Sequence, residues 1–381
     1  MSTLKLNKNI VSNQNVTCNI LNLNPSSQDA STVPSDSNVN AINLFNTNNI
    51  KTLYFLDYPN TYSNGAAHGE GSFAGGVLVP SGNVICIPNN SSNIGIYNPI
   101  TNVYSNGATH GSGGTAFIGG VLVPSGNVIC VPHSSSNVGV YNPITNVYSN
   151  GATHGQGDTA FIGGVLVPSG NVILVPYSSS NIGIYNPITN VYSNGAAHGQ
   201  GGTAFIGGVL VPSGNVICVP FSSYNIGVYN PITNVYSNGA THGQILQSFA
   251  GGVLVPSGNV ILVPYSSLNV GIYNPITNVF TVGPLHGQGA GAFIGGVLAP
   301  NGNVICVPRA SSNIGVYNPI NNIFTVGPLH GQPSLAFIGG VLTPSGKIIF
   351  IPRSSADVGV YSSNYPINDE QVLLSPYFNK L

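Results

Sequence analysis

The sequence predicts an all-β fold in which seven four-stranded blades form a closed ring, a seven-bladed β-propeller. The run GGVL occurs seven times, and each copy starts 44 residues after the one before it. A fixed period of this length is typical of propellers and other repeat architectures. Each repeat holds four short apolar runs separated by turn residues, and none has helical periodicity. The copies of GGVL begin at Gly75, Gly119, Gly163, Gly207, Gly251, Gly295 and Gly339.

Each repeat divides into the same four short strands. In the repeat that starts at Gly119, we predict strands over residues 119–123, 128–131, 138–141 and 146–149. The run PSGN joins the first two strands, because its glycine can adopt a positive φ. The run NP ends the third strand, and the Asn-Gly pair after residue 149 opens the connection to the next repeat.

The order of the strands within a blade follows from their apolar patterns. The first two strands are apolar at almost every position, which is typical of strands covered on both faces. The fourth strand alternates and carries Tyr or Phe, as expected of the outermost strand. The first and last repeats are as apolar as the middle ones, which favours a closed ring over an open solenoid with capping repeats.

The segment before the first repeat resembles the strand that the last repeat lacks. The last repeat loses its pattern after Tyr361, whereas residues 53–65 resemble the ending YNPITNVYSNG of the other units. We therefore predict that residues 52–64 form the outer strand of the blade that begins at Gly339. An N-terminal strand would then close the ring and remove an exposed edge. Residues 365–374 are the alternative closing strand.

The chain is expected to have two regions. Residues 1–50 are polar and rich in asparagine, and we predict that they form an N-terminal arm or tail. Residues 51–381 are predicted to form the propeller, with a C-terminal extension over 362–381.

One segment of the repeat carries a resemblance to a known family. The run YNPITNVY at residues 141–148 resembles the kelch repeat, in which a tyrosine, a turn proline and a later aromatic end each blade. The kelch double glycine is absent at Val131-Pro132, and the chain has no tryptophan. The whole frame is also similar to propeller repeats of giant DNA viruses and some protists. The resemblance implies the propeller fold and says little about activity.

The composition limits the classes of partner. Only 4% of the residues are charged, the net charge is −1, and no basic cluster is present, so we expect no binding to nucleic acid. No apolar run is long enough to span a membrane, and the N-terminus lacks the apolar core of a signal peptide. We expect an intracellular protein of the cytoplasm, a viral factory or the virion, with self-association tolerated.

Four cysteines share one position in the second strand and are expected to be inert. The other three repeats have leucine or phenylalanine there, so the position is predicted to be an apolar core site. We expect no metal, cofactor or disulfide. The cysteines are Cys86, Cys130, Cys218 and Cys306, and the residues that replace them are Leu174, Leu262 and Phe350. Cys18 lies in the N-terminal region without an apparent partner.

One histidine recurs in each connection between repeats, always followed by glycine. The structural interpretation is that each imidazole bonds to backbone and ties neighbouring blades together. The alternative is a ring of imidazoles that holds a metal, an anion or a sugar; no repeated carboxylate accompanies it. The residues are His68, His110, His154, His198, His242, His286 and His330.

The residue after the second-strand proline varies strongly between repeats whose other positions hardly change. This variation is either neutral drift at an exposed site or the signature of a contact face, since aromatic residues and arginine are enriched at binding hot spots. A second variable position, three residues on, includes Tyr224 and Leu268. The candidate binding residues are Asn89, His133, Tyr177, Phe221, Tyr265, Arg309 and Arg353.

Three functional classes remain from the sequence. The favoured one is a non-enzymatic scaffold, associated with a virion or with host components, that presents one loop face to a protein partner. A lectin-like module that binds uncharged glycans is the alternative. An enzyme is disfavoured, because Glu70, Asp158 and Asp357 are isolated and not repeated, whereas acid–base chemistry needs positioned groups.

Overall fold

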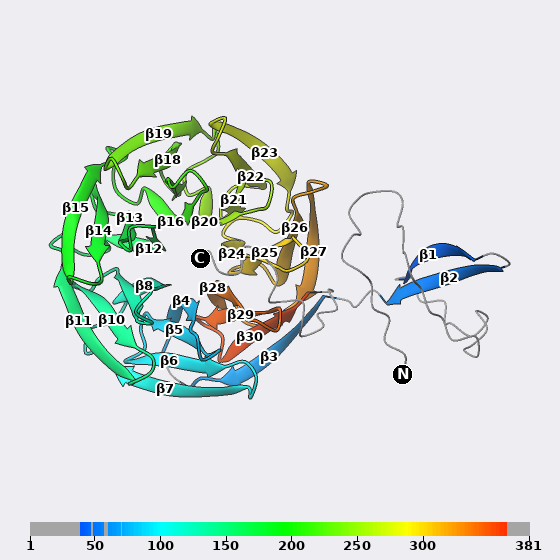
Figure 1. The fold of residues 1–381 in the computed structure, drawn as a ribbon, viewed down its shortest axis with the longest axis horizontal. Helices are drawn as coiled ribbons and strands as arrows, with labels where there is room; N and C mark the ends of the chain where they lie inside the picture. The colour runs from blue at the N-terminus through cyan, green and yellow to red at the C-terminus, as the bar shows by residue number, and fades with distance from the viewer. Residues whose placement is uncertain (1–38, 47–48, 57–59, 70, 364–381) are drawn as a thin grey trace. The chain divides into compact units, whose positions relative to one another are not determined.

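The computed structural model of the protein describes residues 39–46, 49–56, 60–69 and 71–363. The chain divides into two compact units, Met1–Asp57 and Tyr58–Leu381. In the first unit, β1 (Val39–Asn46) pairs antiparallel with β2 (Asn49–Leu56). The second unit contains seven four-stranded antiparallel sheets arranged around one axis, which confirms the predicted seven-bladed β-propeller (Figure 1). Most of the predicted N-terminal arm and C-terminal extension, including Cys18, lies outside the described residues.

Blades 1 to 7 are numbered by their innermost strands, in chain order. The innermost strands are β4 (Phe73–Leu78), β8 (Phe117–Leu122), β12 (Phe161–Leu166), β16 (Phe205–Leu210), β20 (Phe249–Leu254), β24 (Phe293–Leu298) and β28 (Phe337–Leu342). The second strands are β5 (Val84–Pro88), β9 (Val128–Pro132), β13 (Val172–Pro176), β17 (Val216–Pro220), β21 (Val260–Pro264), β25 (Val304–Pro308) and β29 (Lys347–Pro352).

The outer half of each blade has the same regularity. The third strands are β6 (Asn93–Asn98), β10 (Asn137–Asn142), β14 (Asn181–Asn186), β18 (Asn225–Asn230), β22 (Asn269–Asn274), β26 (Asn313–Asn318) and β30 (Asp357–Ser362). The outermost strands are β7 (Val103–Thr109), β11 (Val147–Thr153), β15 (Val191–Ala197), β19 (Val235–Thr241), β23 (Val279–Leu285), β27 (Ile323–Leu329) and β3 (Thr61–Ala67). No membrane-spanning helix occurs among the described residues.

The outer strand is longer than the sequence predicts. In blade 2 it continues through Asn150 to Thr153, whereas the Asn-Gly pair was expected to end it. The register explains the difference: Gly139 pairs with Asn150 and Asn137 pairs with Thr153, so β11 carries one extra residue over this stretch. A bulge accommodates the extra residue and keeps the strand in the sheet. Asn146, predicted to begin the strand, instead has φ 53° in the preceding turn.

An N-terminal strand closes the ring, as predicted, but it is shorter at its start than expected. Strand β3 pairs antiparallel with β30, and Tyr62 lies opposite Tyr361. This pairing matches that of Tyr141 with Tyr148 inside blade 2. The prediction that residues 52–56 also belong to this strand is wrong, because they pair with β1 in a separate hairpin. The alternative closing segment, residues 365–374, lies outside the described residues.

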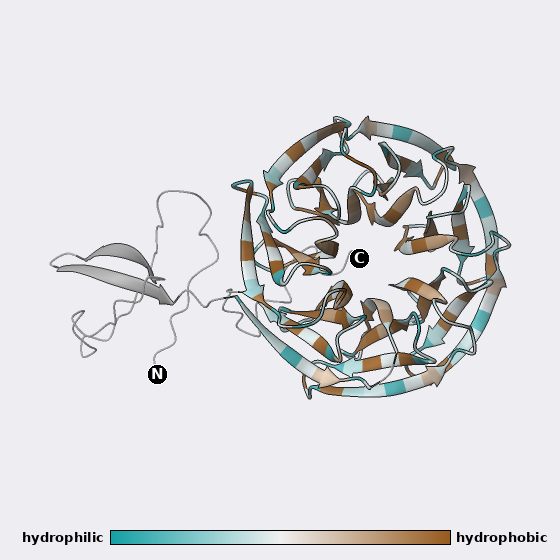
Figure 2. Cartoon of the chain, turned by 180° about the vertical axis from the view of Figure 1, so that it is seen from behind, coloured by the Kyte–Doolittle hydropathy of each residue, from teal (hydrophilic) through white to brown (hydrophobic). Residues whose placement is uncertain are grey.

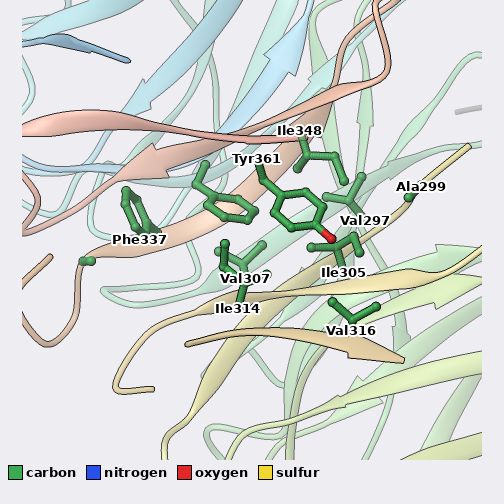
Figure 3. Close-up of a cluster of buried hydrophobic side chains, with 11 residues drawn as sticks. Val297, Ala299, Ile305, Val307, Ile314, Val316, Phe337, Ile348 and Tyr361 are labelled. Carbon is green, nitrogen blue, oxygen red and sulfur yellow. The ribbon is translucent and has the colours of Figure 1, made fainter. Parts of the chain in front are cut away.

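The hydrophobic core lies between neighbouring blades. Figure 3 shows Phe337 and Tyr361 of blade 7 packed among Val297, Val307 and Ile314 of blade 6. Equivalent clusters recur around the ring, so each blade buries its faces only when it has neighbours on both sides. The inner strands are accordingly the more apolar ones, and the rim carries more polar residues (Figure 2).

The repeated cysteines lie in this core. The described ones are free and fully buried, and burial raises the pKa of the Cys130 thiol to about 12. The thiol is therefore protonated at neutral pH and behaves as a small apolar side chain.

Each of the two positions in GGVL must be glycine, for a different structural reason. The first glycines form the innermost circle of the propeller with φ between 80° and 95°, and a Cβ atom on Gly119 would lie 3.0 Å from the Cα atom of Gly163. The second glycines face the preceding blade, and a Cβ atom on Gly120 would lie 2.5 Å from Ile87 Cδ1. The innermost strands can therefore approach one another closely only without side chains.

The run YNPITN, which carries the kelch-like resemblance, has a structural function in blades 1 to 5, where it occurs. In blade 2, Asn142 Oδ1 accepts hydrogen bonds from the amides of Ile144 and Thr145 and thereby closes the turn. The Tyr141 hydroxyl donates to Asn146 Oδ1 over 3.0 Å, and the same oxygen accepts the Ala108 amide of blade 1. This motif therefore stabilises the turn and connects adjacent blades.

Candidate functional site: the loop face

The propeller has two different ends. The strands of each blade alternate in direction, so the loops between second and third strands lie at the same end as the connections from one blade to the next. We call this end the loop face. The short turns PSGN and NPIT lie at the opposite end, which we call the turn face. The repeated histidines and the variable residues both belong to the loop face, as their positions in the repeat predicted.

The backbone of the variable residue joins neighbouring blades. The amide of Tyr177 donates to Ala160 O of its own blade over 2.9 Å, and its carbonyl accepts the Ala204 amide of the next blade over 2.9 Å. His133 makes the same pair of bonds with Ala116 and Ala160. Because these bonds are made by the main chain, the side chain can change between repeats without loss of them.

The variable side chains meet in a continuous arc across five blades. The ring centroids of His133 and Tyr177 are 6.1 Å apart, those of Tyr177 and Phe221 6.2 Å, and those of Phe221 and Tyr265 5.3 Å. The guanidinium carbon of Arg309 lies 4.9 Å from the centroid of Tyr265, a cation–π geometry. We call these five residues the aromatic arc.

The variable site is more buried than an exposed loop position would be. Phe221 is only 6% exposed, and His133, Tyr177, Tyr265 and Arg309 are half-buried. Burial also lowers the pKa of His133, so its imidazole is largely neutral at pH 7. The sequence singled out these positions, but their contacts with one another became visible only in the structure.

Two of the seven variable residues lie outside the arc. Asn89 is 5% exposed, and its side-chain amide donates to Phe117 O over 3.3 Å. Arg353 lies beside a hollow of about 400 Å³ between blades 7 and 1 that also contains His68 and Ser355. Burial first, and then the nearby charge of Arg309, lower the pKa of the Arg353 guanidinium.

The repeated histidines are engaged in hydrogen bonds with the backbone. Nε2 of His154 lies 2.7 Å from Ser135 O, and Nδ1 accepts the Gln156 amide over 3.2 Å. Since Nδ1 accepts, the proton is on Nε2, which donates to the carbonyl. The same pair of bonds recurs at His110, His198, His242, His286 and His330.

The histidines also contact the following blade. The ring of His154 lies edge-on to Phe161 at 5.5 Å and to Tyr192 at 6.0 Å, both in blade 3. His68 bonds Ser355 O in blade 7 and contacts Phe73 in blade 1. This geometry supports the structural interpretation for the six histidines with both ring nitrogens bonded, because nitrogens occupied by backbone partners are not available to a metal or a substrate. Nδ1 of His68 has no such partner among the described residues. No group of three or more His, Cys, Asp or Glu side chains with metal-binding geometry occurs among the described residues.

We expect acid to destabilise the propeller through these imidazoles. Burial lowers the pKa of His198, His242 and His286, so the folded protein holds them neutral. Their stabilisation is complete above the unfolded-state pKa of about 6.5 and is lost as the pH falls through the lower folded-state pKa. Calorimetry should show a constant melting temperature from about pH 8 to about pH 7 and a decrease below about pH 6.5. A melting temperature that stays constant down to about pH 5 would contradict this assignment.

The cavity at the centre of the ring is lined by glycines and therefore has no reactive side chains. A cavity of about 220 Å³ on the axis is lined by the paired glycines of the seven GGVL runs, among them Gly75, Gly76, Gly119 and Gly120. It presents backbone atoms and no side-chain acid, base or nucleophile. The candidate binding residues therefore lie in the aromatic arc and not around the channel.

Comparison of the repeats with one another did not predict a polar network next to the histidines. Gln156 Nε2 donates to Asn194 Oδ1 of the next outer strand over 2.9 Å, and Gln156 Oε1 accepts the Ser179 hydroxyl over 3.0 Å. The regular recurrence of Gln two residues after His was the available signal. This network ties the connection after blade 2 to two polar residues of blade 3, Ser179 and Asn194.

No family model and no curated protein matches the chain. Solved structures with a similar fold include a catalytically inactive virginiamycin B lyase from Staphylococcus aureus with quinupristin, 12% identical with a TM-score of 0.70, covering 80% of this chain and 99% of that one. A streptogramin B lyase is 11% identical with a TM-score of 0.68 and covers 80% and 99%. A fungal alcohol oxidase in complex with copper is 13% identical with a TM-score of 0.62 and covers 80% and 76%. At these identities the similarity shows the propeller fold alone.

Proposed function

We propose that this protein is a non-enzymatic binding propeller that presents its loop face to a protein partner. The aromatic arc carries the proposal, because the position at which the repeats diverge most is where flat and cationic side chains come together. Such side chains supply much of the energy of protein interfaces. Tyrosine and phenylalanine also lose little conformational entropy on binding, since each has two side-chain torsions.

The different roles of the fixed and the variable positions within the repeat support this proposal. The histidines, the Tyr–Asn pairs and the glycines all make contacts that hold the blades together, whereas the hydrogen bonds by which the arc residues join the blades come from their backbone. The low number of basic residues supports a partner other than nucleic acid. The backbone partners of the imidazoles support a role without acid–base catalysis.

Asparagine substitutions in the arc provide the direct test. Tyr177→Asn, Phe221→Asn and Tyr265→Asn together place in blades 3, 4 and 5 the residue that blade 1 has as Asn89. We expect partner capture from source-cell extracts, quantified by mass spectrometry, to fall by about 100-fold. The melting temperature should fall only moderately, because the backbone bonds of these positions remain.

A matched control changes aromatic residues of the outer strands instead. Tyr148→Phe, Tyr192→Phe and Tyr236→Phe introduce the residue that blade 5 has as Phe280. This control should retain the partner. If the arc variant keeps the partner and the outer-strand variant loses it, the rim is the binding surface and the proposal fails.

A lectin-like function is the second candidate. The repetition of one site around a ring favours it, because equivalent sites in neighbouring blades would bind several sugar units of one glycan and gain avidity. The half-buried ring of Tyr177 offers aromatic surface against which an uncharged sugar can pack. Binding on a glycan array that is lost in the triple asparagine variant would favour this function over protein recognition.

The resemblance to giant-virus propellers supports a location in a virion or a viral factory. Mass spectrometry of purified particles and of fractionated source cells tests this location. Recovery of the protein in the particle fraction supports a virion-associated scaffold.

A further inference from the structure

The outer strands of blades 5 and 6 differ from those of blades 1 to 4. The four earlier blades have VYSNGA followed by Thr or Ala, whereas β23 reads VFTVGPL and β27 reads IFTVGPL. The changed residues are exposed: Val282 is 49% exposed, Val326 52%, and Leu285 and Leu329 each 68%. We call the surface formed by Val279, Val282, Leu285, Ile323, Val326 and Leu329 the apolar rim patch.

The two strands that carry the apolar rim patch are neighbours. Strands β23 and β27 follow each other at the rim of the propeller and contact one another (Figure 1). The exposed apolar residues therefore lie on the outer strands of two adjacent blades. Single exposed apolar residues are common on proteins, but a contiguous exposed apolar surface marks an interaction site.

The exchange replaces a coherent polar arrangement. In blade 3, the Tyr192 hydroxyl donates to Asn194 Oδ1 over 2.8 Å, and Gln156 of the preceding connection donates to the same oxygen. Blades 5 and 6 have lost the hydroxyl and the amide together, since Phe280 and Phe324 accompany Val282 and Val326. Both partners of the hydrogen bond seen in blades 2 and 3 are thus absent from blades 5 and 6.

The fold itself gains little from these residues. The valines and leucines remain about half exposed or more, so most of their apolar surface is not buried in the propeller. A hydrophobic side chain in place of a satisfied surface asparagine stabilises a protein only if something covers it. The apolar surface of these residues is therefore available to a partner.

We propose that the apolar rim patch is a self-association surface that binds the same patch of a second copy of this chain. A two-fold interface places each group against its own equivalent, so a patch with charges repels itself and a neutral one does not. Strands β23 and β27 carry no charged residue, and the net charge of the chain is only −1. Contact with the second copy is through the side chains of the patch, because Pro284 and Pro328 leave each outer edge without an amide that edge pairing would use.

The test restores the pattern of the earlier blades. The variant Val282→Asn, Leu285→Thr, Val326→Asn and Leu329→Thr introduces the residues that blade 2 has as Asn150 and Thr153. Sedimentation velocity over a range of concentrations should show a dimer for the full-length protein and a rise in the dimer dissociation constant of about tenfold or more for the variant. The melting temperature of the diluted monomer should be nearly unchanged.

A second measurement does not depend on disruption of the patch. Thr281→Cys places a thiol on exposed β23, while the described cysteines of the chain are buried. Mild oxidation should convert this variant to a covalent dimer, and Ser149→Cys on β11 should remain monomeric. The control Ile144→Thr and Ile188→Thr, at exposed positions of the turn face, should leave the dimer intact.

Three results would overturn the proposal. The first is a full-length protein that is monomeric at every concentration. The second is a four-residue variant that dimerises as strongly as the parent. The third is a monomeric parent that floats with vesicles of neutral phosphatidylcholine while the variant does not, which would assign the patch to a lipid surface.

Discussion

Deletion of residues 1–67 is expected to open the propeller and to lower its melting temperature by roughly 10 °C or more. The deletion removes β3, so β30 becomes an unpaired edge in blade 7. It also removes Tyr62, whose ring centroid lies 6.1 Å from that of His330 and 6.2 Å from that of Phe337. We expect the deleted protein to aggregate on heating, because the exposed edge can pair with other chains.

The matched control deletes only residues 1–57, the first compact unit. This shorter deletion leaves β3 intact and should melt within a few degrees of the full chain. Differential scanning calorimetry and light scattering distinguish the two proteins. If both deletions melt at the same temperature, another segment takes the place of β3 and the closure described by β3 and β30 is not essential.

The repeats made the fold predictable from the sequence. A period without a single insertion fixes the number of blades, and the apolar runs place the inner strands correctly to within a few residues. The closing strand was recognisable because residues 61–65 have the same pattern as the other outer strands. Periodicity thus identified contacts between residues that are far apart in the chain, such as Tyr62 and Tyr361.

The errors occurred where local residue preferences compete with pairing. Asn150-Gly151 has the composition of a turn, but a bulge lets the strand continue through it. Residues 52–56 are apolar and looked like part of the closing strand, but they pair with β1. A pair such as Asn-Gly allows the backbone to turn, but pairing with the neighbouring strand determines which conformation it adopts.

The candidate site was predictable in its positions but not in its geometry. Variation among the repeats identified Tyr177, Phe221 and Tyr265, because an internal comparison of copies separates changing positions from fixed ones. The contacts between their rings depend on the distance between adjacent blades, which the sequence does not contain. The apolar rim patch likewise required the exposure of Val282 and Leu285 to be known.

The glycines at the propeller axis should be among the least tolerant positions in the chain. Gly163 has φ +84°, and a Cβ atom there would lie 3.0 Å from Gly207 Cα, which belongs to the backbone of the next blade and cannot move aside. We expect Gly163→Ala to destabilise the protein by roughly 2–5 kcal/mol, as the sum of left-handed strain and overpacking. Chemical denaturation monitored by intrinsic fluorescence of tyrosine measures this loss.

Gly170 separates the two causes of that destabilisation. It has φ +85° in the turn after β12, and a Cβ atom there would have no neighbour within 4 Å. Gly170→Ala should therefore show only the cost of the left-handed backbone, about 1–2 kcal/mol. The difference between the two variants is the contribution of the close approach of blades at the axis. Equal losses at Gly163 and Gly170 would show that the innermost strands can move apart to admit a methyl group, and that the glycine circle is required for its backbone conformation alone.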